Sequence, residues 1–303
     1  MRIAHFSDLH LMGEGPVPAH RYLNKRLTGL VNLRFRRHAV HKPDVAKRLA
    51  DDTDRHGIEH VVITGDFTNL ALEREFAAAR RYLDAFELTP EKVSIVPGNH
   101  DMYTAGSARS KRFYKTFEPY LTSDLPSCST DHAAGPFPYV HLRGPVALIG
   151  LASALPRPVL IASGNIGKAQ LEALDRILSL PQVRSRLPVI LLHHPPYNGK
   201  LVRTVTNGLY DAPELREVIS RVPHAVVLHG HLHERVLRRF VTGAAILESI
   251  GATSASLVDE LDHKAAGFNL YEVSDAGVWS PPSAAVLDFA RDAIGGRAIL
   301  ETR

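Results

Sequence analysis

The chain has 303 residues, with 36 lysine and arginine residues against 32 aspartate and glutamate residues, and 45% of its residues are hydrophobic. This composition is typical of a globular protein and excludes a disordered or collagen-like chain. The single cysteine, Cys128, excludes a disulfide framework and a thiolate metal site. Because the N-terminus lacks a signal-peptide pattern and prolines interrupt the most apolar stretch, we expect a cytoplasmic protein without a membrane span.

Positive charge is concentrated in one segment. Residues 20–48 carry nine lysine or arginine residues and one acid, a net charge of +8, so the rest of the chain sums to −4. Apolar residues recur at helical spacing from Leu23 to Val31. We expect a covering helix with a solvated basic rim. The alternatives are an anionic ligand or an anionic membrane surface bound through residues 21–37, and, with less support, duplex nucleic acid.

The first half of the chain predicts strands that alternate with helices. This alternation is typical of a parallel sheet built from βαβ units. The expected strands are 3–7, 60–64 and 93–96, and the expected helices are 43–56 and 73–86. Residues 102–135 are rich in Lys, Arg, Ser and Pro, so we expect an irregular, cap-like excursion there with one short helix over 108–117.

The second half repeats the pattern and then changes. The expected strands are 139–142, 146–151, 189–192 and 225–228, and the expected helices are 167–180 and 213–222. After Phe240 short strands follow, which should pack against a second sheet or pair with another subunit. Since no repeat or linker interrupts the chain, we expect one domain over residues 1–303, with a basic insertion at about 12–42.

Five of the expected strands run into polar loops. Since the carboxyl ends of parallel strands lie along one edge of a sheet, these loops should meet. Carboxylates, imidazoles and one amide suit Mn, Fe, Zn or Co and disfavour a soft metal. The five loops are Asp8-Leu9-His10, Gly65-Asp66, Gly98-Asn99-His100-Asp101, His193-His194-Pro195-Pro196 and Gly230-His231-Leu232-His233.

Together the five loops resemble the signature of the calcineurin-like metallophosphoesterases. The resemblance spans residues 1 to about 240, and its most specific parts are Gly-Asn-His-Asp and Gly-His-x-His. Asp-x-His and Gly-Asp alone are common in ordinary loops. The resemblance implies an α/β fold, a four-layer α/β/β/α sandwich of two mixed sheets flanked by helices, with two metal ions at the strand ends.

The resemblance also implies a role for each loop residue. Ions about 3.5–4 Å apart can share a hydroxide that attacks phosphorus, so no side-chain general base is required. Asp66 would bridge both ions because a carboxylate has two oxygens. The implied ligands are Asp8, His10, Asp66 and His233 for one ion, and Asp66, Asn99, His193 and His231 for the other. His100 would act on the leaving-group oxygen, with Asp101 orienting its imidazole.

Some assignments stay open at this point. Of the adjacent His193 and His194 we favour His193 as the ligand, because the family ligand usually lies two residues before the proline, here Pro195. His194 would support the ligand, pack, or face the substrate, and Tyr197 would face the substrate. Asn69 stands where relatives often carry Asp, and we expect it to cap the helix that follows.

The motif set is most similar to that of the bacterial class III cyclic-nucleotide phosphodiesterases. It implies a binuclear phosphodiesterase acting on cyclic nucleotides or similar small phosphodiesters. A first alternative is a hydrolase of a lipid-linked substrate at the inner membrane face, similar to the UDP-diacylglucosamine pyrophosphatases, which usually carry Arg where this chain has His100. The others are a DNA nuclease and a non-catalytic binding scaffold. Substrate selectivity should come from the loops around the crevice.

Overall fold

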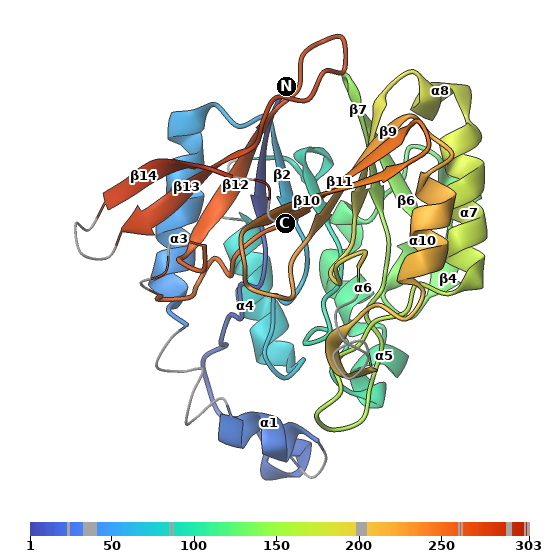
Figure 1. The fold of residues 1–303 in the computed structure, drawn as a ribbon. Helices are drawn as coiled ribbons and strands as arrows, with labels where there is room; N and C mark the ends of the chain where they lie inside the picture. Colours follow the sequence, from blue (N-terminus) through green and yellow to red (C-terminus); the bar gives the residue numbers. More distant parts are fainter. Residues whose placement is uncertain are drawn as a thin grey trace.

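The fold consists of two six-stranded sheets that face each other, with helices outside them (Figure 1). The computed structural model describes residues 1–22, 25–32, 41–84, 86, 88–197, 205–259, 261, 263–288, 293–299 and 301. Within this part of the chain, no helix combines the length and the apolar character needed to cross a membrane.

The first sheet contains the three N-terminal strands and the three C-terminal strands. Its order is β14-β13-β12-β1-β2-β3, and β1, β2 and β3 are parallel while β12 pairs antiparallel with β1. The expected parallel pairing of the N-terminal strands is therefore confirmed, and the antiparallel C-terminal strands make this a mixed sheet, as the resemblance implied. The strand bounds are β1 Arg2–Phe6, β2 His60–Ile63, β3 Val93–Ile95, β12 Gly267–Glu272, β13 Ser283–Asp288 and β14 Ala293–Ala298.

The second sheet has a parallel centre and antiparallel edges. Its order is β10-β11-β9-β8-β7-β6, with β11, β9, β8 and β7 parallel. Strands β10 and β6 close its two sides in antiparallel pairing. The bounds are β6 Tyr139–Arg143, β7 Val146–Gly150, β8 Leu187–Leu191, β9 His224–His229, β10 Val236–Thr242 and β11 Ala245–Gly251.

Alternating side chains divide the second sheet between two cores. Leu148, Val189 and Val226 belong to the core between the sheets, whereas their neighbours Ile149 and Ile190 pack in the outer core that also holds α7 and α10. This alternation follows from the two-residue period of a strand, which sends successive side chains to opposite faces. Because apolar residues occupy both faces, the strands are continuous hydrophobic runs, as is typical of covered parallel strands.

The longer helices lie on the outer faces. α3 and α4 pack beside the first sheet, and α7 and α10 pack on the second (Figure 1). The main helices are α1 Arg26–Asn32, α3 Pro43–Asp52, α4 Glu73–Asp84, α7 Lys168–Ser179, α8 Pro181–Arg184 and α10 Ala212–Ile219. Short 3₁₀ turns are η1 Ala19–Tyr22, η3 Thr53–His56, η4 Pro90–Lys92, η5 Glu118–Tyr120 and η6 Pro126–Cys128.

The excursion at 102–135 is more structured than the sequence predicts. Instead of one helix over 108–117, two short helices, α5 Ala105–Arg109 and α6 Arg112–Phe117, are separated at Lys111. The φ of Lys111 is 49°, a left-handed conformation that a continuous helix does not contain. A hairpin of β4 Thr130–His132 and β5 Gly135–Phe137 completes the excursion.

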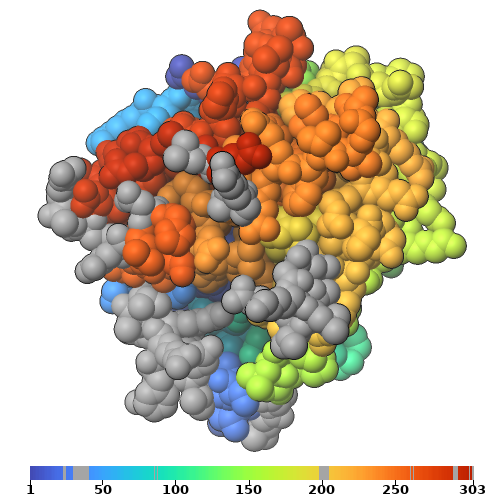
Figure 2. Space-filling model, in the orientation of Figure 1, coloured from blue at the N-terminus to red at the C-terminus, as the bar shows by residue number. Residues whose placement is uncertain are grey.

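The basic segment and the segment after Phe240 carry no catalytic motif, and the structure describes the first only in part. In the basic segment the structure describes η1, α1 and residues 41–48, where α3 begins, whereas residues 23–24 and 33–40 lie outside the described residues. The segment after Phe240 belongs to both sheets, because β11 joins the second and β12 to β14 extend the first. Coloured orange to red, it covers much of the face seen in Figure 2.

Candidate metal centre

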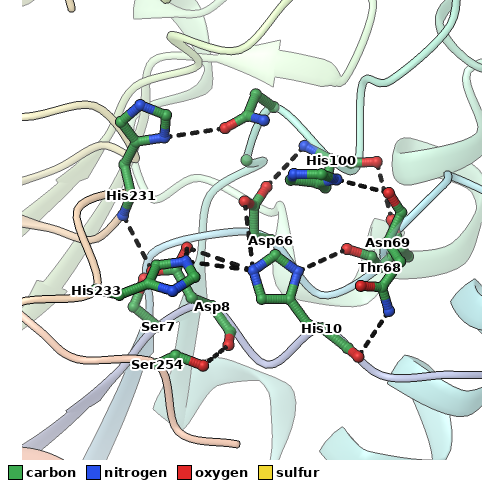
Figure 3. A network of polar contacts seen from close by, with 12 residues as sticks. Ser7, Asp8, His10, Asp66, Thr68, Asn69, His100, His231, His233 and Ser254 are labelled. Carbon is green, nitrogen blue, oxygen red and sulfur yellow. Dashed lines mark hydrogen bonds and ion pairs between the residues drawn. The ribbon is translucent and has the colours of Figure 1, made fainter. Parts of the chain in front are cut away.

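The five polar loops of the sequence analysis converge, and Figure 3 shows residues of four of them close together. Asp8 and His10 follow β1, Asp66 follows β2, and Asn99 follows β3. His193 follows β8, and the pair His231 and His233 follows β9. Residues more than 220 positions apart in the chain are thereby in contact, as the hydrogen bond from His231 N to Asp8 Oδ2 at 3.0 Å shows.

A first group of ligand atoms lies around the end of β1. His233 Nε2 is 3.1 Å from Asp8 Oδ1 and 3.3 Å from His10 Nε2. His10 Nε2 is in turn 3.9 Å from Asp66 Oδ2 and 4.0 Å from Asp8 Oδ1. Two imidazole nitrogens and two carboxylate oxygens therefore point at one small volume.

A second group lies beside it and shares one atom with the first. His193 Nε2 is 3.4 Å from Asp66 Oδ2 and 3.0 Å from Asn99 Oδ1. His231 Nδ1 is 3.0 Å from the same Asn99 oxygen and 3.2 Å from His193 Nε2. Because Asp66 Oδ2 faces both His10 and His193, this oxygen stands at the junction of the two groups.

The donor atoms fit a pair of cations. Two pairs of imidazole nitrogens face each other at 3.2 and 3.3 Å, an arrangement that a shared cation explains better than a shared proton. Asp8 Oδ1 is buried and accepts no hydrogen bond of regular geometry within the described chain, although His233 lies close. Imidazoles, carboxylates and an amide oxygen suit Mn, Fe, Zn or Co.

Both carboxylates are fixed by the backbone of another ligand loop. Asp8 Oδ2 accepts from His231 N at 3.0 Å, and Asp66 Oδ1 accepts from His100 N at 2.7 Å. In each case one oxygen is held by an N–H group and the other is turned toward the ligand group. The loops therefore orient one another, so the site forms only when both sheets are assembled.

The ligand loops adopt a left-handed backbone. Asp8, His10, Asp66, His231 and His233 have φ values between 48° and 70°. Such conformations cost a non-glycine residue on the order of 1–2 kcal/mol each and concentrate at functional sites.

Two glycines in these loops permit close approach between them. A Cβ on Gly98 would overlap the backbone nitrogen and Oδ1 of Asp66, and a Cβ on Gly230 would overlap Ser7 Oγ. The glycines of the Gly-Asn-His-Asp and Gly-His-x-His motifs are therefore required by packing between loops.

Charges in the site favour bound cations. Burial opposes ionisation of Asp66, but His193 and His100 outweigh it and hold the pKa of Asp66 well below its usual value. Burial of Asp8 is likewise outweighed by His233, which lowers its pKa to about 2. Burial and the neighbouring His193 lower the pKa of His231 to about 3. At neutral pH the site thus offers two carboxylates and the neutral imidazole of His231. Burial opposes a charge on His193, but Asp66 outweighs it and raises the pKa of His193 to about 9, so a cation bound to this imidazole must displace a proton.

Two ligand imidazoles are held by main-chain carbonyl oxygens. His193 Nδ1 donates to Thr64 O at 2.7 Å, and His231 Nε2 donates to Asn207 O at 2.9 Å. These bonds leave His193 Nε2 and His231 Nδ1 turned toward the shared volume. A hydrogen bond on one ring nitrogen orients the other as a ligand. Sequence patterns do not reveal such carbonyl partners, because every residue carries one.

His100 lies at the edge of the ligand groups. Its Nδ1 donates to Asn69 O at 2.6 Å, and its ring stacks on Tyr103 at 5.5 Å with an interplanar angle of 10°. The prediction that Asp101 orients this imidazole is wrong. The Asp101 carboxylate accepts from the backbone N–H groups of Thr68 at 3.0 Å and Gly98 at 2.9 Å, and so fixes the two neighbouring loops.

Three further assignments need correction. His194 does not face a substrate, because it is fully buried and contacts Ser153 Oγ at 2.9 Å and Ala162 O at 2.8 Å. Tyr197 is also turned away, since it packs on His229 and Phe240 with its hydroxyl buried. Burial raises the pKa of Tyr197 to about 12.

Asn69 does not cap α4. Its side chain donates to His10 O at 2.7 Å, so it supports the first ligand loop. Glu75 performs the capping role instead by accepting from Leu70 N at 2.9 Å and Leu72 N at 3.0 Å. In the sequence, the acid three positions beyond Leu72 is the signal that could have identified the cap.

A cavity of about 490 Å³ opens beside the ligand groups. Its lining includes Asp66, Asn99, His100 and the two histidines of the last motif, together with Asn207 and Lys264. Sequence analysis missed the segment that contains Leu257, Asp259 and Lys264, because no motif marks it. Its approach to the site depends on strand pairing of the C-terminal residues with β1.

Comparison with known proteins agrees with this geometry. A family model described as calcineurin-like phosphoesterase matches residues 1–235. A probable cyclic nucleotide phosphodiesterase of Synechococcus is 28% identical over 133 residues, which cover 44% of this chain and 48% of that protein. The 3',5'-cyclic adenosine monophosphate phosphodiesterase CpdA of Escherichia coli K12 is 26% identical over 183 residues, 60% of this chain and 57% of that protein. The chain thus spans about half the length of these curated relatives.

Solved structures share the fold at low sequence identity. A dimetal phosphatase from Danio rerio matches with a TM-score of 0.60 and 14% identity, covering 99% of this chain and 96% of that one. The purple acid phosphatase PPD1 from yellow lupin matches with a TM-score of 0.55 and 11% identity, covering 97% and 52%. At these identities the likeness shows the two-sheet fold, as the sequence analysis expected.

Proposed function

The chain belongs to the calcineurin-like phosphoesterases, hydrolases that act on phosphoesters with a pair of metal ions, and we propose that it is a phosphodiesterase for cyclic nucleotides or similar small phosphodiesters. The observation that carries the proposal is the position of Asp66 Oδ2 between two groups of ligand atoms, in a residue that lines one cavity. The two cyclic nucleotide phosphodiesterases that share part of the sequence support this substrate class.

The proposed centre uses seven side chains. They are Asp8, His10, Asp66, Asn99, His193, His231 and His233. Two cations held there would supply a water nucleophile at neutral pH and neutralise charge on the phosphate. The chain itself fixes the geometry, because the backbone N–H groups of His231 and His100 orient the two carboxylates.

His100 is the proposed proton donor to the leaving group. The carbonyl oxygen of Asn69 can only accept, so Nδ1 of His100 keeps its proton in either charge state of the ring. Proton exchange with a substrate is therefore assigned to Nε2. Stacking on Tyr103 fixes the ring plane, and the side chain lines the cavity beside Asp66. These features supply the fixed orientation that general acid catalysis requires.

Lys264 is the proposed source of phosphate selectivity at the cavity wall. It lines the same cavity as the proposed ligands, and its ammonium group is 3.7 Å from Glu234 Oε1. A half-exposed ammonium group of this kind can contact a non-bridging phosphate oxygen. Asn207 lines the same wall and can hydrogen-bond a ribose or base.

The test is a substrate panel on purified protein loaded with Mn²⁺. It compares 3',5'-cyclic AMP, bis(p-nitrophenyl) phosphate and p-nitrophenyl phosphate. We expect hydrolysis of both diesters and its loss in Asp66→Ala, while His20→Ala, a substitution at an exposed surface residue, leaves the rate unchanged. Hydrolysis of the monoester alone would overturn the proposal.

A second candidate is a lipid-linked phosphodiester or pyrophosphate processed at an anionic membrane surface. Lys25 Nζ donates to Arg157 O at 2.8 Å, which joins the start of α1 to the loop that carries Leu160. Leu160 is 90% exposed and Leu27 is 55% exposed. Exposed apolar side chains beside basic residues are typical of an interfacial surface.

Vesicle flotation separates this candidate from the first. The vesicles contain phosphatidylglycerol and phosphatidylethanolamine, and the variants are Leu160→Asp and Leu27→Asp. If the surface binds membranes, both variants should release the protein from vesicles. Val278→Asp, which changes another exposed apolar residue, should leave binding unchanged. Absence of wild-type binding would remove the candidate.

A further inference from the structure

A third imidazole lies beside the first ligand group. His41, which is 7% exposed, has its ring centroid 4.8 Å from that of His10 and 5.8 Å from that of His233. One potential ligand atom from each of these three histidines lies within 4.8 Å of the others. The family motifs do not include this residue, and the sequence analysis placed it inside the basic insertion without a role.

The position of His41 is fixed by its own surroundings. Lys42 N donates to Ser256 O at 2.8 Å, and His41 forms an antiparallel bridge with Leu257. Immediately after it, Pro43 starts α3, and Lys42 has the extended conformation that a following proline favours. The residue is thus held from the C-terminal side by α3 and laterally by the segment after β11.

The side chain of His41 is oriented as a ligand would be. Its Nδ1 contacts Ser256 Oγ at 2.8 Å, so Nε2 is the nitrogen that would bind a cation. A metal-bound histidine commonly donates its other ring N–H to an oxygen in this way. Ser254 connects the same region to the site, since its hydroxyl donates to Asp8 O at 2.6 Å.

We propose that His41 supplies a further imidazole to the cation held by Asp8, His10 and His233. The inference rests on the metal centre of the proposed function. It makes the first group richer in nitrogen, with three imidazoles, than the second, which has two imidazoles and an amide oxygen. Since imidazole suits Zn, Fe and Co better than Mn, the two positions should differ in metal preference.

The same contact joins the basic insertion to the centre at both ends. The insertion leaves the site after Leu11, whose neighbour His10 is a proposed ligand, and returns at His41. A cation bound to both histidines would therefore link the two described ends of this insertion.

The experiment titrates the metal-free protein with Zn²⁺ and Co²⁺. Calorimetry measures the affinity of each equivalent, and the absorption spectrum reports the ligands of Co²⁺. In His41→Ala we expect about 10–100-fold weaker binding of one equivalent and a changed Co²⁺ spectrum. His41→Gln keeps most of the side-chain volume and should show the same loss of affinity. It provides the test if the alanine variant does not fold. His20→Ala, an exposed histidine of the same insertion, should match the wild type.

Each outcome distinguishes the two proposals. Unchanged affinity and spectrum in both His41 variants would overturn the assignment of His41 and leave the centre intact. A wild-type protein that binds fewer than two equivalents would instead overturn the binuclear centre on which the proposed function depends.

Discussion

A buried polar chain joins the two sheets, and its response to acid can be calculated. His60 Nε2 contacts Ser94 Oγ at 2.8 Å, the same hydroxyl contacts His141 Nδ1 at 2.8 Å, and His141 Nε2 donates to Thr122 O at 2.9 Å. His60 and His141 are fully buried. Strands β2 and β3 of the first sheet are thereby connected to β6 of the second.

Acid should weaken this connection. Burial, with a smaller effect of Arg143, lowers the pKa of His141 from 6.5 to about 4. The unfolded chain therefore takes up a proton below pH 6.5 that the folded protein does not accept. Stability is full above pH 6.5 and falls by about 1.4 kcal/mol for each pH unit down to about pH 4, a loss of about 3 kcal/mol from this residue.

The perturbation is His141→Gln, measured by urea denaturation of metal-free protein between pH 7.5 and pH 4.5. At pH 7.5 the variant should be less stable by about 1–3 kcal/mol, because Ser94 and Thr122 lose well-placed partners. On acidification this difference should shrink, by about 2 kcal/mol at pH 5. A difference that stays constant within about 0.5 kcal/mol would refute the reasoning. The exposed His20→Gln is the matched control.

Three further predictions concern the centre itself. Gly98→Ala should reduce bound metal to less than one equivalent, since its Cβ would overlap Asp66, whereas Gly296→Ala, where a Cβ meets nothing within 4 Å, should keep both; metal analysis distinguishes them. His100→Asn should lower kcat on a diester about 100-fold with unchanged metal content, and a parallel loss of metal would contradict its role as proton donor. Chelation should abolish activity and lower the Tm. The free energy of unfolding should fall by about 3 kcal/mol if metal had been present at 100 times its Kd. Re-addition of Mn²⁺ should restore both activity and stability.

The sequence was informative wherever a strand runs directly into a polar loop. Asp66 and Asn99 could be placed because each follows a short buried strand, and parallel strands bring their ends to one edge. The strand itself is predictable because its residues are β-branched and apolar. This rule brought the loops together, and the assignment of seven ligands among their residues came from the resemblance to the calcineurin-like metallophosphoesterases.

Interactions set by packing across the fold could not be predicted in this way. His194 is adjacent to a proposed ligand, yet its ring points into the outer layer because successive residues at the end of β8 face opposite sides. Asp101 and Asn69 bind backbone groups of loops that lie more than 30 residues away in the chain. The approach of His41 depends on strand β12 lying antiparallel to β1, which carries no local signal.

The distribution of backbone strain bears on the alternative that the chain is only a binding scaffold. Of the eight non-glycine residues with positive φ in the described part of the chain, five are proposed ligands. At about 1–2 kcal/mol each, these conformations take up a sizeable part of the roughly 5–15 kcal/mol by which a folded protein is stable. A scaffold that binds a partner through its surface gains nothing from them. Binding of a cation pair requires these conformations, because the left-handed turns bring Asp8, Asp66 and the paired imidazoles into contact. The free energy of metal binding can then offset the strain.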